Sequence, residues 1–200
     1  MNLIDLWSLC RQARSEEFHP IGSVAIKGGA DTGYVLFKNG IAYVIIDGSS
    51  NALEWINNFV VFKLGKHGTH SGFYTASQRL LPQIEILLKG WVGQVIIAGH
   101  SRGGALAMQI ALELSSPSVS VVTFGAPRVG GRRFAQACVD RGLQAVRVAI
   151  DRDVVTQAPP KWLGTNWAHY GDPIILNFKG DGTIYDIHHA YGNLLIIKDH

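Results

Sequence analysis

The first part of the chain, to about residue 90, combines one helical pattern with several extended ones. Apolar side chains recur at helical spacing near the N-terminus and predict an amphipathic helix from Leu3 to about Arg14. Extended runs follow at residues 24–27, 33–37 and 41–47. The dipeptide Asn39-Gly40 separates the last two runs and is typical of a hairpin turn. We therefore expect an antiparallel pair of strands, followed by a short helix at 51–58 and a long one at 73–89.

From residue 94 the pattern changes to short apolar runs that alternate with helical ones. The predicted strands are residues 95–98, 119–124 and 143–150, and the predicted helices are 105–114 and 132–141. Such alternation indicates parallel strands that helices cover on both faces. Another strand is predicted at 174–178 and a weaker one at 183–185, before a C-terminal helix from about Ile187. The expected fold is α/β, with a mostly parallel central sheet, an N-terminal antiparallel hairpin and helices on both faces.

Composition supports a single folded domain over residues 1–200. The chain is 47% hydrophobic and only 16% charged, which is too apolar for intrinsic disorder. Its formal net charge of +3 comes from scattered residues, so it offers no basic stripe for nucleic acid. Cys10 and Cys138 lie far apart without metal-ligand spacing, and we expect buried thiols rather than a disulfide or a zinc site.

The apolar runs are also informative about location. They are shorter than the roughly 18 to 20 residues that span a bilayer, so no transmembrane segment is expected. The N-terminus lacks a signal-peptide pattern, which favours a cytoplasmic protein, although release by another route would leave no trace in the sequence.

The segment Gly99-His100-Ser101-Arg102-Gly103-Gly104 lies between a predicted strand and a predicted helix. This placement is typical of a nucleophile elbow, in which a strained turn exposes a serine above the sheet. A Cβ at the flanking positions would collide with the neighbouring strand and helix, which explains glycine at 99, 103 and 104. The alternatives are a plain tight strand-to-helix turn or a phosphate-binding loop, and no lysine follows the glycines as a phosphate-binding loop would require.

An elbow serine needs a base and an acid to activate it, and in hydrolases of this type they follow in the order Ser, Asp or Glu, His. The candidate acids are Asp140, Asp151, Asp153, Asp172, Asp181 and Asp186, and the candidate bases are His169, His188 and His189. Asp151 and Asp153 follow a predicted core strand, where open α/β sheets place their sites.

Over residues 33–195 the chain resembles the class 3 lipases, the fungal-type triacylglycerol lipase family of α/β-hydrolases. Its strongest matches are GHSRGGALA at 99–107 and VTFGAPRVG at 122–130. The resemblance of RVAIDRDVVTQAPP at 147–160 assigns the catalytic acid to Asp153, with Asp151 as the alternative. His188-His189-Ala190-Tyr191 is similar to the family's H-x-x-Y and makes His188 the base, with His189 as the alternative.

The resemblance also implies an oxyanion hole. The segment VIIDGSSNALEWINNF at 44–59 is similar to a family strand that ends in R-G-[ST]. By this likeness Ser49 supplies one backbone N–H and Arg102 the other. Asp47 replaces the family's arginine and Glu54 replaces an aspartate, and a carboxylate near a developing oxyanion is unfavourable unless it points away or is paired.

The family places its lid between Trp55 and His70. Here residues 56–69 contain a short apolar run, which either covers an acyl pocket and touches a lipid surface or forms one more buried strand. His67 and His70 could suggest a metal pair, but no cysteine or carboxylate completes a site, so we expect structural roles for both.

Together these features favour a serine hydrolase that cleaves carboxylic esters, of acylglycerols or other lipids, with phospholipase A1-like action included. The resemblance implies no cofactor and no metal ion. Two alternatives use the same fold: a catalytically silent protein that binds a lipid or a partner, with Asp47 as the sign of lost activity, and an acyltransferase or peptidase that uses the same triad.

Overall fold

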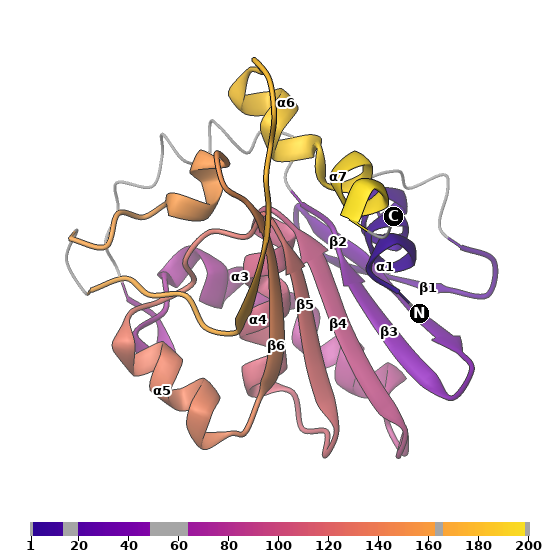
Figure 1. The fold of residues 1–200 in the computed structure, drawn as a ribbon. Coiled ribbons are helices and arrows are strands. Elements are labelled where there is room, and N and C mark those ends of the chain that lie inside the picture. The colour runs from indigo at the N-terminus through magenta and orange to yellow at the C-terminus, as the bar shows by residue number, and fades with distance from the viewer. Residues whose placement is uncertain (1, 14–19, 49–63, 163–165, 199–200) are drawn as a thin grey trace.

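The computed structural model describes residues 2–13, 20–48, 64–162 and 166–198 (Figure 1). Its centre is a seven-stranded sheet in which the strands follow one another in sequence order. The strands are β1 (Val24–Gly28), β2 (Asp31–Lys38), β3 (Ile41–Ile46), β4 (Gln94–His100), β5 (Val119–Phe124), β6 (Gln144–Ile150) and β7 (Asp172–Leu176). The helices are α1 (Leu3–Gln12), α3 (Ser71–Leu87), α4 (Arg102–Glu113), α5 (Arg132–Asp140), α6 (Ile184–His189) and α7 (Tyr191–Lys198), with 3-10 turns η1 (Lys66–Gly68) and η2 (Val154–Gln157).

The first three strands pair antiparallel and the rest pair parallel. The predicted hairpin is confirmed: Lys38 pairs with Ile41, and Asn39 and Gly40 between them have φ of 53° and 73°. Two central residues with positive φ match the twist of the flanking strands, and Asn-Gly accepts that conformation at low cost.

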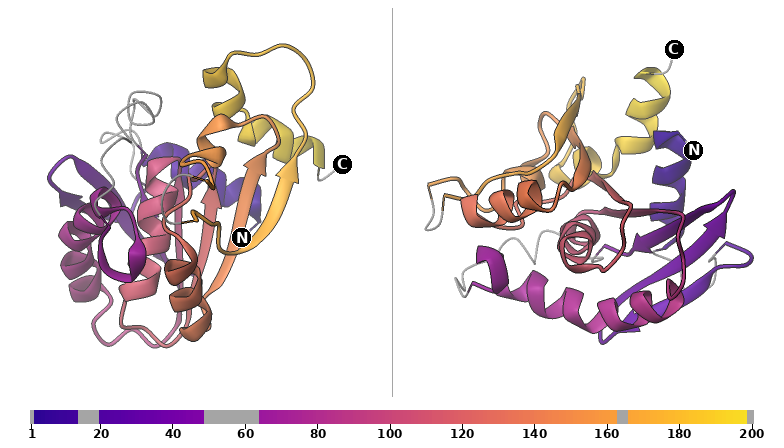
Figure 2. Two further views of the ribbon diagram at one scale, coloured as in Figure 1. Left: turned by 90° about the vertical axis from the view of Figure 1, so that its left-hand side faces the viewer. Right: turned by 90° about the horizontal axis from the view of Figure 1, so that it is seen from below.

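Helices cover both faces of the sheet, as predicted. From β3 onward each crossover is expected to be right-handed and moves to the next strand in the same direction, so α3, α4 and α5 all fall on one face. The opposite face carries α1 and α7, which lie side by side although they come from the two ends of the chain (Figure 2).

Two apolar cores result, one on each side of the sheet. The core under α3, α4 and α5 includes Val44, Phe73, Ile97, Leu106, Phe134 and Cys138. The core under α1 and α7 includes Trp7, Cys10, Tyr34, Ile45, Phe124 and Tyr191. Both cysteines are free and buried, as predicted. Val44 and Ile45 are neighbours in β3 yet point into different cores, because successive strand residues face opposite sides.

One predicted strand is wrong. Residues 183–185 lie at the start of α6, where the Thr183 side chain accepts from the Asp186 N–H and Asp186 in turn accepts from the Thr183 N–H. This capping box stabilises a helix, although the sequence Thr-Ile-Tyr has high β-propensity. β7 also begins at Asp172, two residues before the predicted 174.

Two further expectations concern a membrane-spanning segment and the helix at 51–58. In the described part of the chain, no helix is long and apolar enough to cross a membrane. The predicted helix at 51–58 lies outside the described residues.

Candidate active site

Ser101 stands at the junction of β4 and α4 with φ of 56° and ψ of −126°. A non-glycine residue with positive φ is strained, and this conformation is the one that a nucleophile elbow requires. The strain is held by main-chain bonds: the Ser101 N–H donates to the Phe124 carbonyl at 2.8 Å, and the Ser101 carbonyl accepts from the Gly104 N–H at 3.0 Å.

The glycines predicted from steric reasoning lie where side chains do not fit. A Cβ on Gly99 would lie 2.4 Å from the Gly103 carbonyl carbon, and a Cβ on Gly103 would lie 2.4 Å from the Ile46 oxygen. A Cβ on Gly104 would lie 2.8 Å from the Ala126 Cβ. These separations are too short for any real side chain, so α4 packs directly on β3 and β4 at its first turn. That close approach brings the helix N-terminus beside Ser101.

Asp153 and His188 form a buried pair. Asp153 is the N-cap of η2, just after β6, and His188 lies in α6; their side chains are 0% and 2% exposed. Asp153 Oδ2 lies 2.8 Å from His188 Nδ1. The other carboxylate oxygen, Oδ1, accepts from the Val155 N–H at 3.0 Å. The acid therefore fixes the imidazole with Nδ1 as the hydrogen-bearing nitrogen, which leaves Nε2 as the base.

Ser101 Oγ and His188 Nε2 are both buried and have no hydrogen-bond partner among the described residues. Ser101 is only 1% exposed. Orphaned buried polar atoms cost free energy, so in a folded protein they usually serve a ligand or a reaction. A hydroxyl and a basic nitrogen left in this state are the two atoms that a nucleophile and its general base require.

The alternative acid and bases occupy other places. Asp151 is exposed, and its Oδ1 accepts from the Phe178 N–H at 3.1 Å. His189 stacks on Tyr185 with ring centroids 4.0 Å apart, and its Nδ1 lies 2.8 Å from the Tyr185 carbonyl. His169 Nε2 lies 2.7 Å from the Thr156 carbonyl. Burial, followed by the charge of Arg147, lowers the pKa of His169 to about 3.

His100, the residue before Ser101, contacts His188 through both its ring nitrogen and its ring face. Its Nε2 lies 3.0 Å from the His188 carbonyl oxygen, and the two rings lie 4.5 Å apart between centroids. Trp7 of α1 meets the His100 ring edge-on at 5.1 Å. The N-terminal helix thus packs against His100, which in turn contacts His188.

Tyr191 contacts Asp153, and the sequence assigned it no role. Its hydroxyl donates to Asp153 Oδ2 at 2.7 Å and accepts from the Ile150 N–H at 3.3 Å. Burial, together with the charge of Asp153, raises the pKa of Tyr191 well above its usual value, so the hydroxyl keeps its proton. The H-x-x-Y pattern marked this residue, but its contact with Asp153 spans 38 positions and needs the fold.

The expected oxyanion hole is described in part. Arg102 is the first residue of α4, so its N–H is one of those that a helix leaves without an internal acceptor. Ser49 lies outside the described residues, as does Glu54. The preceding residue, Gly48, is next to the nucleophile: a Cβ built on it would lie 3.6 Å from Ser101 Cβ.

Two acidic residues lie near this part of the site. The Arg102 side chain forms an ion pair with the buried Asp31 of β2, which ties the first turn of α4 to the sheet. The Asp47 N–H donates to the Thr32 carbonyl at 2.9 Å. Burial, followed by the charge of Asp47, raises the pKa of the Cys10 thiol, which indicates that this carboxylate lies near α1.

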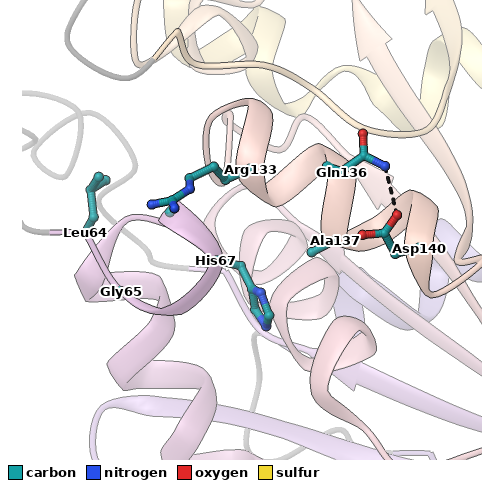
Figure 3. Close-up of a pocket in the computed structure, with 8 residues that line it drawn as sticks. Leu64, Gly65, His67, Arg133, Gln136, Ala137 and Asp140 are labelled. Carbon is teal, nitrogen blue, oxygen red and sulfur yellow. Dashed lines mark hydrogen bonds between the residues drawn. The ribbon is translucent and has the colours of Figure 1, made fainter.

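Leu64, Gly65, His67 and Gly68, at the end of the expected lid, line part of a separate pocket (Figure 3). This open pocket of about 540 Å³ lies between η1 and α5, and none of Ser101, Asp153 and His188 lines it. His67 Nε2 is 3.3 Å from Glu113 Oε1, and His70 Nδ1 accepts from the Gly72 N–H at 3.2 Å to cap α3. Within the described ranges no three His, Cys, Asp or Glu residues gather as a metal site. Residues 56–63 lie outside those ranges, so the alternatives for the lid stay predictions.

The fold and the buried Ser, His and Asp define an α/β-hydrolase, and comparison with known proteins gives the family. The family model for lipase (class 3) matches residues 43–162. The chain therefore belongs to the class 3 lipase family.

Individual relatives agree with this assignment. The chain is 30% identical over 147 residues to a lipase of Rhizomucor miehei, a match that covers 65% of this chain and 40% of the relative. It is 29% identical over 140 residues to a chloroplastic/mitochondrial phospholipase A1 of Oryza sativa subsp. indica, covering 58% and 32%. The matched part thus spans 32% to 40% of these relatives' length.

Solved structures show the same fold. A lipase from Rhizopus microsporus var. chinensis superimposes with a TM-score of 0.65 at 25% identity, covering 80% of this chain and 62% of that one. A triacylglycerol lipase whose catalytic centre is described as a serine protease triad gives a TM-score of 0.66 at 27% identity, covering 78% and 65%.

Proposed function

We propose that this protein is a serine hydrolase that cleaves carboxylic esters of lipids through Ser101, His188 and Asp153. The observation that carries the proposal is the 2.8 Å contact between Asp153 Oδ2 and His188 Nδ1, beside a strained serine whose Oγ is buried without a partner in the described chain. The class 3 lipase family supports the ester chemistry.

In this mechanism His188 Nε2 removes the proton of Ser101 Oγ while that oxygen attacks the ester carbonyl carbon. Asp153 stabilises the imidazolium that forms, and Tyr191 and Val155 hold Asp153 in position. The Arg102 N–H, together with the N–H expected from Ser49, donates hydrogen bonds to the developing oxyanion. One such donor is worth about 3 to 4 kcal/mol in measured cases. His188 then protonates the leaving alkoxide, and water cleaves the acyl-enzyme by the same steps.

The rim of the site supports contact with a lipid surface. Exposed apolar side chains occur in the segments around Asp153 and His188: Val154 is 39%, Ile184 45% and Tyr185 57% exposed. Trp162, in the loop after η2, is 81% exposed. Exposed apolar side chains that gather at a site mark interaction surfaces. Sedimentation with phosphatidylcholine vesicles tests this part of the proposal. Trp162→Ala should weaken binding. Val92→Ala should not, because this 89% exposed residue precedes the amino end of β4, whereas Ser101 follows the carboxyl end of that strand.

Ester turnover tests the chemical part. The purified chain is assayed on p-nitrophenyl esters of several acyl lengths, on a triacylglycerol and on a phospholipid, alongside Ser101→Ala. Hydrolysis that the variant loses supports the proposal, and the panel identifies the preferred acyl length and head group. A rate that is unchanged in Ser101→Ala would remove Ser101 from the reaction.

A further inference from the structure

The nucleophile and the base are carried by elements of very different rigidity. Ser101 follows β4, the central strand of the seven. His188 lies in α6, a helix of six residues that stands above the carboxyl ends of the strands (Figure 1) and packs against η2 and α7. A helix this short is not stable on its own, so tertiary contacts must fix its position. The reaction needs Ser101 Oγ and His188 Nε2 within hydrogen-bond reach, and these contacts therefore decide whether the base is in place.

His100 connects the two elements through a hydrogen bond. It is the last residue of β4 and is only 4% exposed. Its Nε2 lies 3.0 Å from the main-chain carbonyl oxygen of His188. Because a carbonyl oxygen only accepts, Nε2 carries the hydrogen and donates it. The His188 carbonyl is in the last turn of α6, where a helix leaves its carbonyls without an internal donor, so the bond also satisfies one of these groups.

The His100 ring is itself held in place. Its centroid lies 4.5 Å from that of the His188 ring. Trp7 of α1 packs edge-on against His100 at 5.1 Å, and Tyr191 of α7 does so at 5.8 Å. These contacts from three helices leave the ring little room to turn. Since His100 and Ser101 are adjacent in the chain, a fixed His100 ring holds its N–H donor at a fixed place relative to the nucleophile.

We propose that His100 is a positioning residue, which sets the distance between Ser101 and His188 by donating from Nε2 to the His188 main-chain carbonyl. This role rests on the ester hydrolysis proposed above. The bond holds His188 by its main chain and leaves both of its ring nitrogens for the reaction, Nδ1 for Asp153 and Nε2 for Ser101. Asp153 thus sets the orientation of the imidazole, and His100 sets its place above the sheet.

Two substitutions separate the hydrogen bond from the packing of the ring. His100→Phe keeps a ring of similar size and loses the donor, whereas His100→Gln loses the ring and keeps an amide N–H that can reach the same carbonyl. His100→Phe should lower kcat about 10- to 100-fold and leave KM within about 2-fold, because misplacing the base affects the transition state and not substrate binding. The rate of labelling by a fluorophosphonate ester should fall by a similar factor. His100→Gln should recover most of both rates.

Tyr170→Phe is the matched control. The Tyr170 hydroxyl donates to the Leu143 carbonyl at 2.6 Å, and its ring packs against the core under α5, on the other face of the sheet. This variant therefore also loses a side-chain bond to a carbonyl, but far from His188. It should unfold at a lower urea concentration than the wild type and keep a normal kcat.

Proton NMR provides a readout that does not depend on turnover. The hydrogen between Asp153 Oδ2 and His188 Nδ1 should give a far-downfield resonance while the imidazole is held against the carboxylate. That resonance should shift or broaden in His100→Phe and return in His100→Gln. A wild type that shows this response but hydrolyses no ester would contradict the proposed function and still support the positioning of His188 by His100.

Three results would overturn the role of His100. The first is a wild-type kcat with an unchanged resonance in His100→Phe. The second is an equal loss of kcat in His100→Phe and His100→Gln, which would assign the effect to ring packing. The third is a similar loss of kcat in Tyr170→Phe, which would assign it to lower stability. If His100→Phe does not fold, His100→Asn takes its place, because the shorter amide does not reach the His188 carbonyl.

Discussion

The Tyr191 hydroxyl donates to Asp153 Oδ2 at 2.7 Å, and the same oxygen lies 2.8 Å from His188 Nδ1. Tyr191 is the first residue of α7, three positions after His188. One short segment therefore supplies both the base and a second hydrogen bond to the acid that orients it. Because Tyr191 is fully buried, its hydroxyl has little freedom to move away from the carboxylate.

Tyr191→Phe should lower kcat about 3- to 10-fold with little change in KM, because Asp153 loses a bond that fixes its position. The free energy of unfolding should fall by about 1.5 to 3 kcal/mol, the usual range for a hydrogen bond to a charged group. Steady-state kinetics and urea unfolding measure the two effects. The control is Tyr34→Phe, which removes a buried hydroxyl bonded to the Leu9 carbonyl at 2.9 Å. Tyr34→Phe should lose stability alone, and equal losses of kcat in both variants would contradict a specific role for Tyr191.

The two aspartates after β6 should differ sharply in their effect on activity. Asp153→Asn keeps the shape of the side chain but replaces the carboxylate beside His188 Nδ1 with a neutral amide, which no longer fixes the tautomer of the imidazole. The value of kcat should therefore fall by about 10⁴-fold. Asp151→Asn should leave kcat within about 2-fold, because an exposed amide oxygen can still accept from the Phe178 N–H. The comparison needs only ester assays of the two purified variants. A large loss in Asp151→Asn with an active Asp153→Asn would transfer the acid role to Asp151.

Gly125 packs against Asp153, His188 and Tyr191. Its φ is 59°, and a Cβ on it would lie 2.9 Å from the Tyr191 hydroxyl, 3.0 Å from Asp153 Oδ2 and 3.0 Å from His188 Cε1. Gly125→Ala should therefore displace the acid and the base and reduce kcat at least about 10-fold.

Gly142→Ala is the matched control for this substitution. Gly142 has a similar φ of 66°, but a Cβ on it would meet nothing within 4 Å. It should show only the backbone cost of about 1 to 2 kcal/mol in unfolding free energy, with normal kcat. Equal kcat in the two variants would show that the space around Gly125 does not matter for catalysis.

His169 should make the protein less stable in acid. Burial and the neighbouring arginine lower its pKa to about 3, whereas an unfolded histidine titrates near about 6.5. Between these values the unfolded state binds a proton that the folded state does not. The stability that neutral His169 contributes is thus fully present above about pH 6.5 and is lost as the pH falls toward 3, by up to about 1.4 kcal/mol per pH unit.

Urea unfolding of the wild type and His169→Gln between pH 7 and pH 4 measures this effect. The variant should show a shallower decline in unfolding free energy over that range. Parallel curves would mean that His169 is not held neutral in the folded protein.

Local chemistry allowed much of the fold and the elbow to be predicted. Asn39-Gly40 has a conformational preference of its own, and the glycines around Ser101 reflect contacts with adjacent main chain. At residues 183–185 two local signals competed, and the helix cap formed by Thr183 and Asp186 prevailed over β-propensity. The side-chain cap is visible in the sequence as the Thr-x-x-Asp pattern of residues 183–186.

Contacts between distant segments could not be predicted in this way. Tyr191 meets Asp153, and His100 meets His188, only because the fold brings them together. The resemblance to class 3 lipases pointed to Asp153 and His188, since the sequence alone offered several acids and three histidines. The position of Ser49 and the role of residues 56–63 remain predictions.

Labelling by a fluorophosphonate ester tests the central claim most directly, because only a serine activated by a base reacts with it. The wild-type chain should gain one adduct, and peptide mass spectrometry should place it on Ser101. His188→Gln should label far more slowly although it retains Ser101, while His189→Gln should label at nearly the wild-type rate. An intact, folded wild type that stays unlabelled, or an adduct on another residue, would contradict the account.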